Sequence, residues 1–178
     1  EDDYRNISGQ YDVFVSVGML EHVGPAQYGS FGEVIDRSLP RDAGRGLLHF
    51  IGRNRPHLLN PWIRRRVFPD AYPPTLVEVA AAVFEPRDLS ILDVENLRLH
   101  YARTCTEWLA RFEAAEGDLT RMVGPEWYRT WRLYLAGSAA AFTTGWMQLF
   151  QVAFVRGSDN ALPWTRAELY RGSTRVSP

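Results

Sequence analysis

The sequence predicts an α/β fold in which two parallel strands are joined by a helix. Residues 11–17 are mostly β-branched or aromatic, which is typical of a central parallel strand covered on both faces. Residues 46–52 form a second short apolar run, bounded by glycines. Between them, apolar residues recur at i, i+3 and i+4 spacing over residues 25–39, which predicts a helix. This order gives a right-handed crossover and neighbouring parallel strands.

Titratable side chains lie at the ends of both predicted strands. Glu21 and His22 come directly after the first strand, and His49 lies within the second. In open α/β sheets, ligands bind outside the carboxyl ends of the strands, so Glu21 and His49 are candidate site residues. Two structural alternatives stay open at this point: Glu21 caps or pairs with the following helix, and His49 is an ordinary core histidine.

The rest of the chain is predicted to be helical before it returns to a strand. Residues 157–178 lose all periodicity and are expected to form a mobile C-terminal tail. A proline is tolerated at the first position of a helix, which places one helix start at Pro125. In chain order, the predicted elements are a helix over 75–84, a strand over 89–99, a helix over 101–115, a helix from 125 and a strand over 146–155.

Composition narrows the class of protein. The chain has 178 residues, of which 46% are hydrophobic and 23% charged, as in a globular segment that buries a substantial core. The single cysteine, Cys105, excludes an internal disulfide and a thiolate metal cluster, and no metal site is expected. It is predicted to be a small core residue of a helix. A net charge of −1 argues against a nucleic-acid partner.

All basic residues are arginines, and they are unevenly distributed. Eight arginines and one acid, Asp42, lie between Arg37 and Arg66. The run ends in three consecutive arginines, 64–66, beside the aromatic residue Phe68. One interpretation is a solvated face. The other is contact with anionic lipid head groups, to which each arginine adds roughly 1 kcal/mol near such a surface.

Several motifs, taken in order, resemble one enzyme family. They are Ser-Val-Gly-Met-Leu-Glu-His-Val-Gly at 16–24, Leu-Leu-His-Phe-Ile-Gly at 47–52, Asn-Pro-Trp-Ile at 60–63, Glu-Trp-Leu-Ala-Arg-Phe at 107–112 and Gln-Leu-Phe-Gln-Val-Ala-Phe at 148–154. The chain closely resembles the cyclopropane-fatty-acyl-phospholipid synthases and, more distantly, the mycolic acid cyclopropane synthases. The resemblance covers nearly the whole chain.

The resemblance implies a class I S-adenosylmethionine-dependent methyltransferase fold, which is Rossmann-like, with helical insertions that cover the substrate. That fold begins with a strand and a glycine-rich turn for the cofactor. The nearest such pattern here, residues 44–46, precedes the second predicted strand. Residues 1–156 are therefore expected to be the C-terminal portion of the catalytic domain, and the isolated chain is expected to be inactive.

The activity implied by the resemblance is methyl transfer to the cis double bond of unsaturated phospholipid acyl chains. Methyl transfer leaves a carbocation, and a base must remove a methyl proton to close the cyclopropane ring. The site must exclude water and hold that base within about 3 Å of the proton. A methyl-branched or methylene product, methylation of a nitrogen or oxygen, and an inactive interaction module stay open as alternatives.

In the family the base is a bound bicarbonate. The resemblance assigns this anion site to Glu21, His49, the backbone of Ile51 and Tyr101, with Glu21, His49 and Tyr101 as the catalytic side chains. Histidine and tyrosine can donate hydrogen bonds to the anion, and Glu21 would orient the donors or take up the proton. Without the resemblance, Tyr101 would be interpreted as a core residue.

The resemblance also assigns a cofactor site and leaves one residue out. Tyr4 and Arg5 match positions that flank the adenine of S-adenosylmethionine in relatives. Ser138 stands where an older proposal for the family placed a catalytic cysteine, and the mechanism above needs no thiol. Ser138 is therefore not assigned to catalysis.

The cosubstrate and cofactor follow from the same resemblance, whereas the location follows from the single cysteine, typical of a reducing cytoplasm, and from the arginine run. The expected cosubstrate is S-adenosylmethionine, with bicarbonate as cofactor. The expected location is cytoplasmic, peripheral at the inner face of the membrane on an anionic lipid surface. A homodimer of the full-length protein is left open.

Overall fold

The computed structural model describes residues 2–160 and 164–168 of the chain. Most of the predicted C-terminal tail, 161–163 and 169–178, therefore lies outside the described residues, and its predicted mobility stays untested. The described part of the tail includes a short helical turn, η4 (Arg166–Glu168), from which Arg166 pairs with Asp93 of the sheet.

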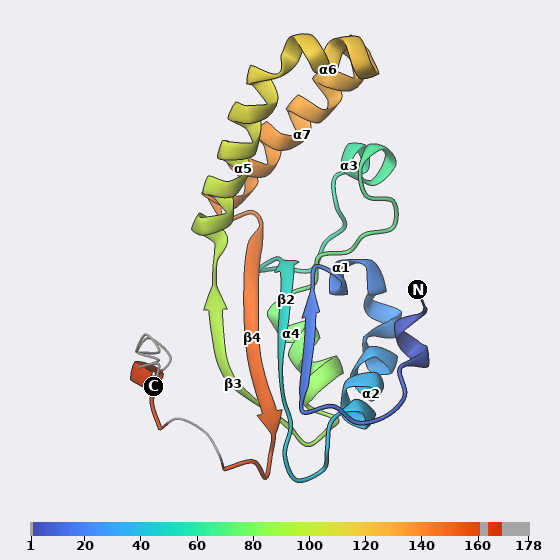
Figure 1. Cartoon of the computed structure of the whole chain (residues 1–178), viewed down its shortest axis with the longest axis vertical. Helices are drawn as coiled ribbons and strands as arrows, with labels where there is room; N and C mark the ends of the chain where they lie inside the picture. The colour runs from blue at the N-terminus through green and yellow to red at the C-terminus, as the bar shows by residue number, and fades with distance from the viewer. Residues whose placement is uncertain (1, 161–163, 169–178) are drawn as a thin grey trace, which may run out of the picture.

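A mixed four-stranded sheet forms the centre of the molecule (Figure 1). Its strands lie in the order β1-β2-β4-β3. The first two are parallel, with Val17 opposite His49, which confirms the predicted pairing of neighbouring parallel strands. Strand β4 is antiparallel to both of its neighbours. The strand bounds are β1 (Val13–Val17), β2 (Arg45–Gly52), β3 (Leu89–Asn96) and β4 (Gln148–Arg156).

Strand β1 corrects one prediction. It lies at an edge of the four-stranded sheet, not at its centre. Successive side chains of a strand point to opposite faces, and Val13, Val15 and Val17 point to a face on which they are 54%, 58% and 63% exposed. The expectation of a strand covered on both faces is wrong because no described element packs over these three valines.

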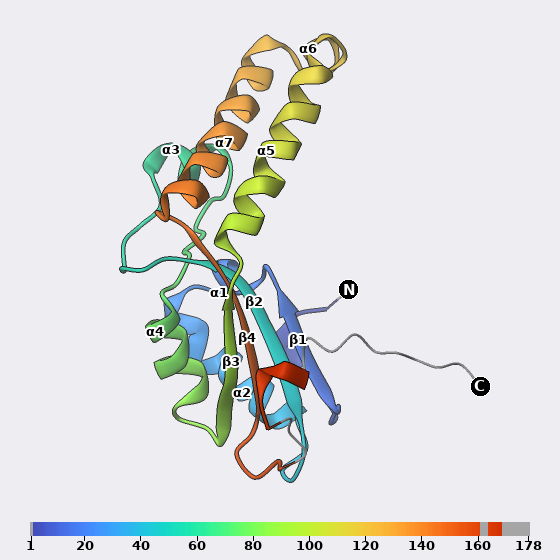
Figure 2. The same cartoon turned by 90° about the vertical axis from the view of Figure 1, so that its left-hand side faces the viewer.

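The other face of the sheet is covered by helices (Figure 2). Helix α2 (Tyr28–Ser38) lies within the range 25–39 over which the apolar spacing predicts a helix. Two short turns precede it, α1 (Leu20–Val23) and η2 (Pro25–Gln27). Helix α4 (Leu76–Val79) continues into a π-helical turn, η3 (Ala80–Phe84). Its start is fixed by a capping box between Thr75 and Glu78. The core under these helices includes Phe31, Ile35, Leu48, Phe50, Val83 and Phe154.

A helical arm extends beyond one end of the sheet (Figure 1). It consists of α5 (Arg98–Ala114), α6 (Glu116–Val123) and α7 (Pro125–Thr144). Helix α7 begins at Pro125, as predicted. The strand predicted to reach residue 99 ends at Asn96, whose side chain accepts the N–H of Arg98, the first residue of α5, at 3.0 Å. Helix α6 was not predicted, since only Ala115 separates it from α5.

The base of the arm makes a second, smaller core with the sheet. Ala102, Cys105 and Phe142 of the arm pack with Leu149 of β4. Cys105 is buried, which confirms its predicted core role. Within the described residues, none of the helices has the length and apolar character needed to cross a membrane.

Two short segments complete the described fold. The turn η1 (Tyr4–Asn6) lies near the N-terminus, and α3 (Pro61–Arg66) lies in the long loop after β2. Helix α3 begins where the Asn60 side chain accepts the Trp62 N–H at 2.8 Å. Its loop reaches toward the arm, where the Phe68 ring meets Tyr134 of α7 edge-on at 5.8 Å.

Candidate functional site

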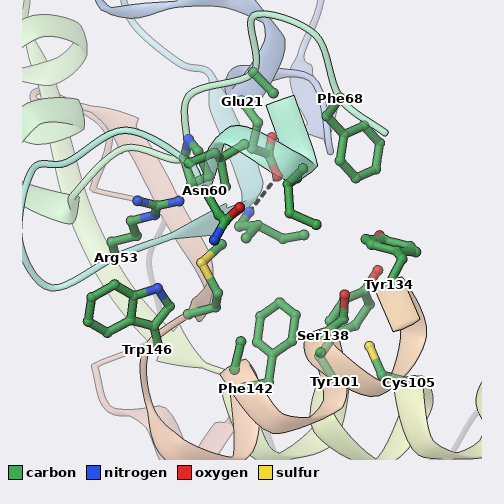
Figure 3. Close-up of a pocket in the computed structure, with 18 of the residues that line it drawn as sticks. Glu21, Arg53, Asn60, Phe68, Tyr101, Cys105, Tyr134, Ser138, Phe142 and Trp146 are labelled. Carbon is green, nitrogen blue, oxygen red and sulfur yellow. Dashed lines mark hydrogen bonds between the residues drawn. The ribbon is translucent and has the colours of Figure 1, made fainter. Parts of the chain in front are cut away.

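A pocket of about 670 Å³ lies where the end of β2, turn α1, the α3 loop and the arm meet (Figure 3). This volume is typical of small-molecule sites, which range over about 300–1,000 Å³. Polar groups are few and its walls are largely apolar, contributed among others by Ile63, Phe68, Leu133, Phe142, Trp146 and Met147.

Glu21 is the buried acid of this pocket. Its side chain is 6% exposed, and its Oε1 accepts the N–H of Ile51 at 2.5 Å. Its Oε2 is buried without a hydrogen-bond partner. Burial raises the pKa of Glu21 above its usual value, against the opposing effect of the Ile51 hydrogen bond. The carboxylate therefore reaches across to β2, and the structure does not support the alternative in which it caps or pairs with the following helix.

Tyr101 reaches the pocket from the first turn of α5. Its ring meets Phe142 at 4.9 Å and Trp108 at 5.9 Å, both edge-on. Burial raises the pKa of Tyr101 to about 12, so its hydroxyl keeps its proton at neutral pH and can donate a hydrogen bond. The residue therefore packs as a core side chain and also faces the pocket.

His49 and Ile51 lie on one face of β2, because residues i and i+2 of a strand share a face. Ile51 lines the pocket, but His49 is not among the described residues that do. Partial burial lowers the pKa of His49, which favours the neutral imidazole. The Ile51 N–H is already bonded to Glu21. The structure thus brings Glu21, Ile51 and Tyr101 together and leaves His49 behind them on the strand.

The predicted cofactor residues lie apart from this pocket, in η1. The ring of Tyr4 meets Phe31 edge-on at 5.7 Å and borders a shallow hollow with Met19, which follows β1. The Arg5 guanidinium is held by Asp3, through Nε to Oδ1 at 2.9 Å and Nη2 to Oδ2 at 2.7 Å. Tyr4 is therefore available beside the end of β1, whereas Arg5 already has a partner.

Arg53 is a pocket residue that the sequence did not single out. It follows β2 directly, lines the pocket and is 2% exposed. The interpretation of the arginine run as a solvated face is wrong for this position. The one available signal was its place two residues after Ile51, which continues the pocket-facing side of the strand. Ser138 also lines the pocket, from α7, without having been assigned to catalysis.

Comparisons with known proteins agree with this fold. Residues 1–152 match the family model described as mycolic acid cyclopropane synthetase. The chain is 38% identical to a probable fatty acid methyltransferase of Pseudomonas putida over 95% of its own length and 45% of that protein. It is 37% identical to the cyclopropane-fatty-acyl-phospholipid synthase of Escherichia coli K12 over 90% and 41% of the two chains. The chain thus spans less than half the length of these relatives.

Solved structures give the same result for the fold. The mycolic acid cyclopropane synthase CmaA1, complexed with SAH and CTAB, superposes with a TM-score of 0.78 at 26% identity, over 86% of this chain and 58% of that one. The cyclopropane synthase MmaA2 from Mycobacterium tuberculosis gives a TM-score of 0.79 at 24% identity, with the same coverage. These comparisons confirm the predicted methyltransferase fold. Together with the family match over residues 1–152, they show that the chain belongs to the mycolic acid cyclopropane synthetase family of methyltransferases.

Proposed function

We propose that the active protein transfers a methyl group from S-adenosylmethionine to the cis double bond of an unsaturated phospholipid acyl chain and closes a cyclopropane ring. Bound bicarbonate is the base that removes the proton. The observation that carries this proposal is the buried, unpaired Oε2 of Glu21 in an otherwise largely apolar pocket.

The pocket suits a carbocation. Apolar walls exclude water, which would otherwise quench the cation. The faces of aromatic rings stabilise nearby positive charge, and Tyr101, Phe142 and Trp146 supply such rings (Figure 3). The double bond itself needs no deprotonation before it attacks, so a base is required only after the methyl transfer.

The polar groups fit a small hydroxylated anion. A bicarbonate carries a hydroxyl group that the free Oε2 of Glu21 can accept, and the protonated Tyr101 can donate to one of its oxygens. A buried acceptor without a partner costs about 1–3 kcal/mol, which such a ligand would recover. The Ile51 N–H could serve the anion only if Glu21 released it. His49 is assigned a supporting role as a neutral donor behind Ile51.

S-adenosylmethionine supplies the electrophilic methyl group when it is bound. Tyr4 would stack against its adenine beside the end of β1, and Arg5 would have to leave Asp3 to take part. The SAH in the CmaA1 complex supports this cosubstrate for the family fold.

The substrate class is supported by the relatives. One bears the name cyclopropane-fatty-acyl-phospholipid synthase and another probable fatty acid methyltransferase. A third, from Mycobacterium tuberculosis, is named a tuberculostearic acid methyltransferase and is 31% identical. A methyl-branched or methylene product is therefore the second candidate, because it requires only a different fate for the same cation.

The protein is proposed to act from the cytoplasm at the inner face of the membrane. The exposed arginines 65 and 66 at the end of α3, beside the partly exposed Phe68, suit an anionic lipid surface. These residues lie in the same loop that forms one wall of the pocket. A chain entering the pocket from a bilayer would thus pass the basic segment.

Lipid analysis of cells that express the active protein tests the proposal. Cyclopropane, methyl-branched and methylene acyl chains differ in mass and fragmentation, so the product can be identified directly. Cells that express the Glu21→Gln variant serve as the matched control. Unmodified acyl chains in cells with folded wild-type protein would contradict lipid methylation, and a branched chain would favour the second candidate.

A further inference from the structure

Arg53 is a buried cation without an acidic partner. Its Nη1 donates to the carbonyl oxygens of His57 at 2.9 Å and Leu58 at 3.0 Å, and it also contacts the His57 ring. Its Nε is buried without a hydrogen-bond partner. Among the described residues, Nη2 makes no hydrogen bond and no carboxylate pairs with the guanidinium.

Among the described residues, a second arginine is fully buried, and it shows how this fold accommodates such a charge. Arg156 is 1% exposed and forms an ion pair with Asp36. It also donates to the carbonyl oxygens of Pro40 at 2.9 Å and Leu39 at 3.1 Å. Arg156 therefore has both its charge and its donors satisfied within the chain, and Arg53 has neither fully satisfied.

An uncompensated buried charge is costly, by several kcal/mol in real proteins. Burial lowers the pKa of Arg53, yet a guanidinium starts from so high a value that it stays charged at neutral pH. An anion that enters the pocket would compensate this charge.

The free donors of Arg53 define the shape of that anion. Nε and Nη2 form one edge of the guanidinium fork, which binds two oxygens of a carboxylate or phosphate at once. Arg5 uses this same edge on the two carboxylate oxygens of Asp3. In Arg53 the edge is unused, because only Nη1 is tied to the loop.

We propose that Arg53 binds the phosphate of the phospholipid substrate and thereby positions the acyl chain in the pocket. The inference rests on the proposed function, since it names the part of that substrate which the pocket recognises by charge. Arg53 and Trp146 lie at one side of the pocket, and Tyr101, Cys105 and Tyr134 lie at the other (Figure 3). A phosphate at Arg53 would leave the apolar remainder of the pocket to the chain.

Calorimetric binding to the 178-residue chain tests this assignment, because Arg53 and the other pocket residues named above all belong to it. The probes are monomeric dihexanoyl phosphatidylglycerol and dihexanoylglycerol, which carry the same chains with and without the phosphoglycerol head group. We expect the wild-type chain to bind the phospholipid at least about tenfold more tightly, the effect of a charge-assisted hydrogen bond. Equal affinity for the two lipids would overturn the proposal without any variant.

Variants then locate the effect. Arg53→Met is expected to weaken binding of the phospholipid by roughly tenfold to a hundredfold and to leave dihexanoylglycerol unchanged. Arg53→Lys keeps the charge but loses the fork, so we expect an intermediate affinity. Arg55→Met is the matched control, since Arg55 is exposed two residues further along the same loop. Equal losses for both lipids in Arg53→Met would mean a structural role and would contradict the assignment.

Inorganic phosphate distinguishes a lipid head group from a free anion. We expect it to compete only weakly with the phospholipid, and displacement at equal concentration would assign the site to free phosphate instead. The outcome is separable from the proposed function. If binding depends on the phosphate but cells contain no modified lipids, the phosphate site stands and the proposed function is contradicted. If cells contain modified lipids but Arg53→Met binds the phospholipid as the wild type does, only the phosphate site is contradicted.

Discussion

Oε1 of Glu21 accepts the backbone N–H of Ile51 at 2.5 Å, while Oε2 of the same carboxylate is buried and unpaired. One oxygen therefore fixes the side chain to the end of β2, and the other is left for a ligand. A substitution at Glu21 can therefore be measured in two ways, by its effect on turnover and by its effect on stability as a function of pH.

The first prediction concerns stability as a function of pH. The pKa of Glu21 is raised in the folded state, so the folded chain binds more protons than the unfolded chain between the unfolded and folded pKa values. Its contribution to stability is therefore favourable at low pH and is lost as the pH rises through the folded pKa. In the wild type, Glu21 should lower the melting temperature as the pH rises. We expect this contribution to be absent from Glu21→Gln. An equal dependence of melting temperature on pH in the wild type and the variant would contradict the raised pKa of Glu21.

The second prediction concerns turnover by the same variant. Glu21→Gln keeps the size of the side chain but removes its charge. If Glu21 orients the base, the active enzyme should slow by about a hundredfold, the usual effect of removing one preorganised group. Added bicarbonate should partly restore the rate where only affinity for the anion has fallen. Wild-type turnover in this variant would refute the assignment.

The third prediction concerns Tyr101. Tyr101→Phe removes the hydroxyl but keeps the ring contacts with Phe142 and Trp108. We expect slower turnover, partly relieved by bicarbonate, with a melting temperature close to that of the wild type. Tyr128→Phe is a suitable control, because Tyr128 is buried against Phe112 in the arm rather than placed in the pocket. Parallel loss of activity and melting temperature in Tyr101→Phe would indicate a purely structural role.

His49 gives the fourth prediction, and the structure sharpens it. His49→Gln keeps a donor and an acceptor on a side chain of similar length. Because His49 lies behind Ile51 and does not line the pocket, we expect a smaller loss of turnover than for Glu21→Gln, at an unchanged melting temperature. A fall in melting temperature without any response to bicarbonate would favour the ordinary core histidine that the sequence left open.

Much of the fold could be predicted because its signals are local. The apolar spacing of α2 and the paired strands β1 and β2 follow from neighbouring residues alone. The edge position of β1 could not be predicted in this way. A run of valines looks the same whether a second layer covers it or not, and the exposure of Val15 depends on segments far away in the chain.

The residues of the candidate site could likewise be predicted only in part. The place of Glu21 after a strand and the motif resemblance of Tyr101 singled out these two residues, and the structure brings both to one pocket. Arg53 was hidden in a run of arginines. Its Nη1 donates to the carbonyl oxygens of His57 and Leu58, and the His57 ring contacts Trp146, from a distant part of the chain, at 4.8 Å. No short stretch of the sequence contains both His57 and Trp146.

The last prediction concerns the three arginines, 64–66, that end α3. Reversing their charge should weaken binding to vesicles of anionic lipid, measured by co-sedimentation, with little change in melting temperature, since none of the three is buried. Each contributes roughly 1 kcal/mol near such a surface, and the attraction decays over about 8 Å at physiological ionic strength, so added salt should weaken wild-type binding as well.

The matched control for this experiment is charge reversal at Arg103, Arg111 and Arg129, which are exposed on the arm and change the net charge equally. If net charge alone governed binding, both triple variants would lose it to the same extent. A selective loss at 64–66 would instead place the membrane against the α3 loop, next to Phe68 and the pocket wall. Unchanged co-sedimentation of the 64–66 variant at low salt would leave these arginines as a solvated face.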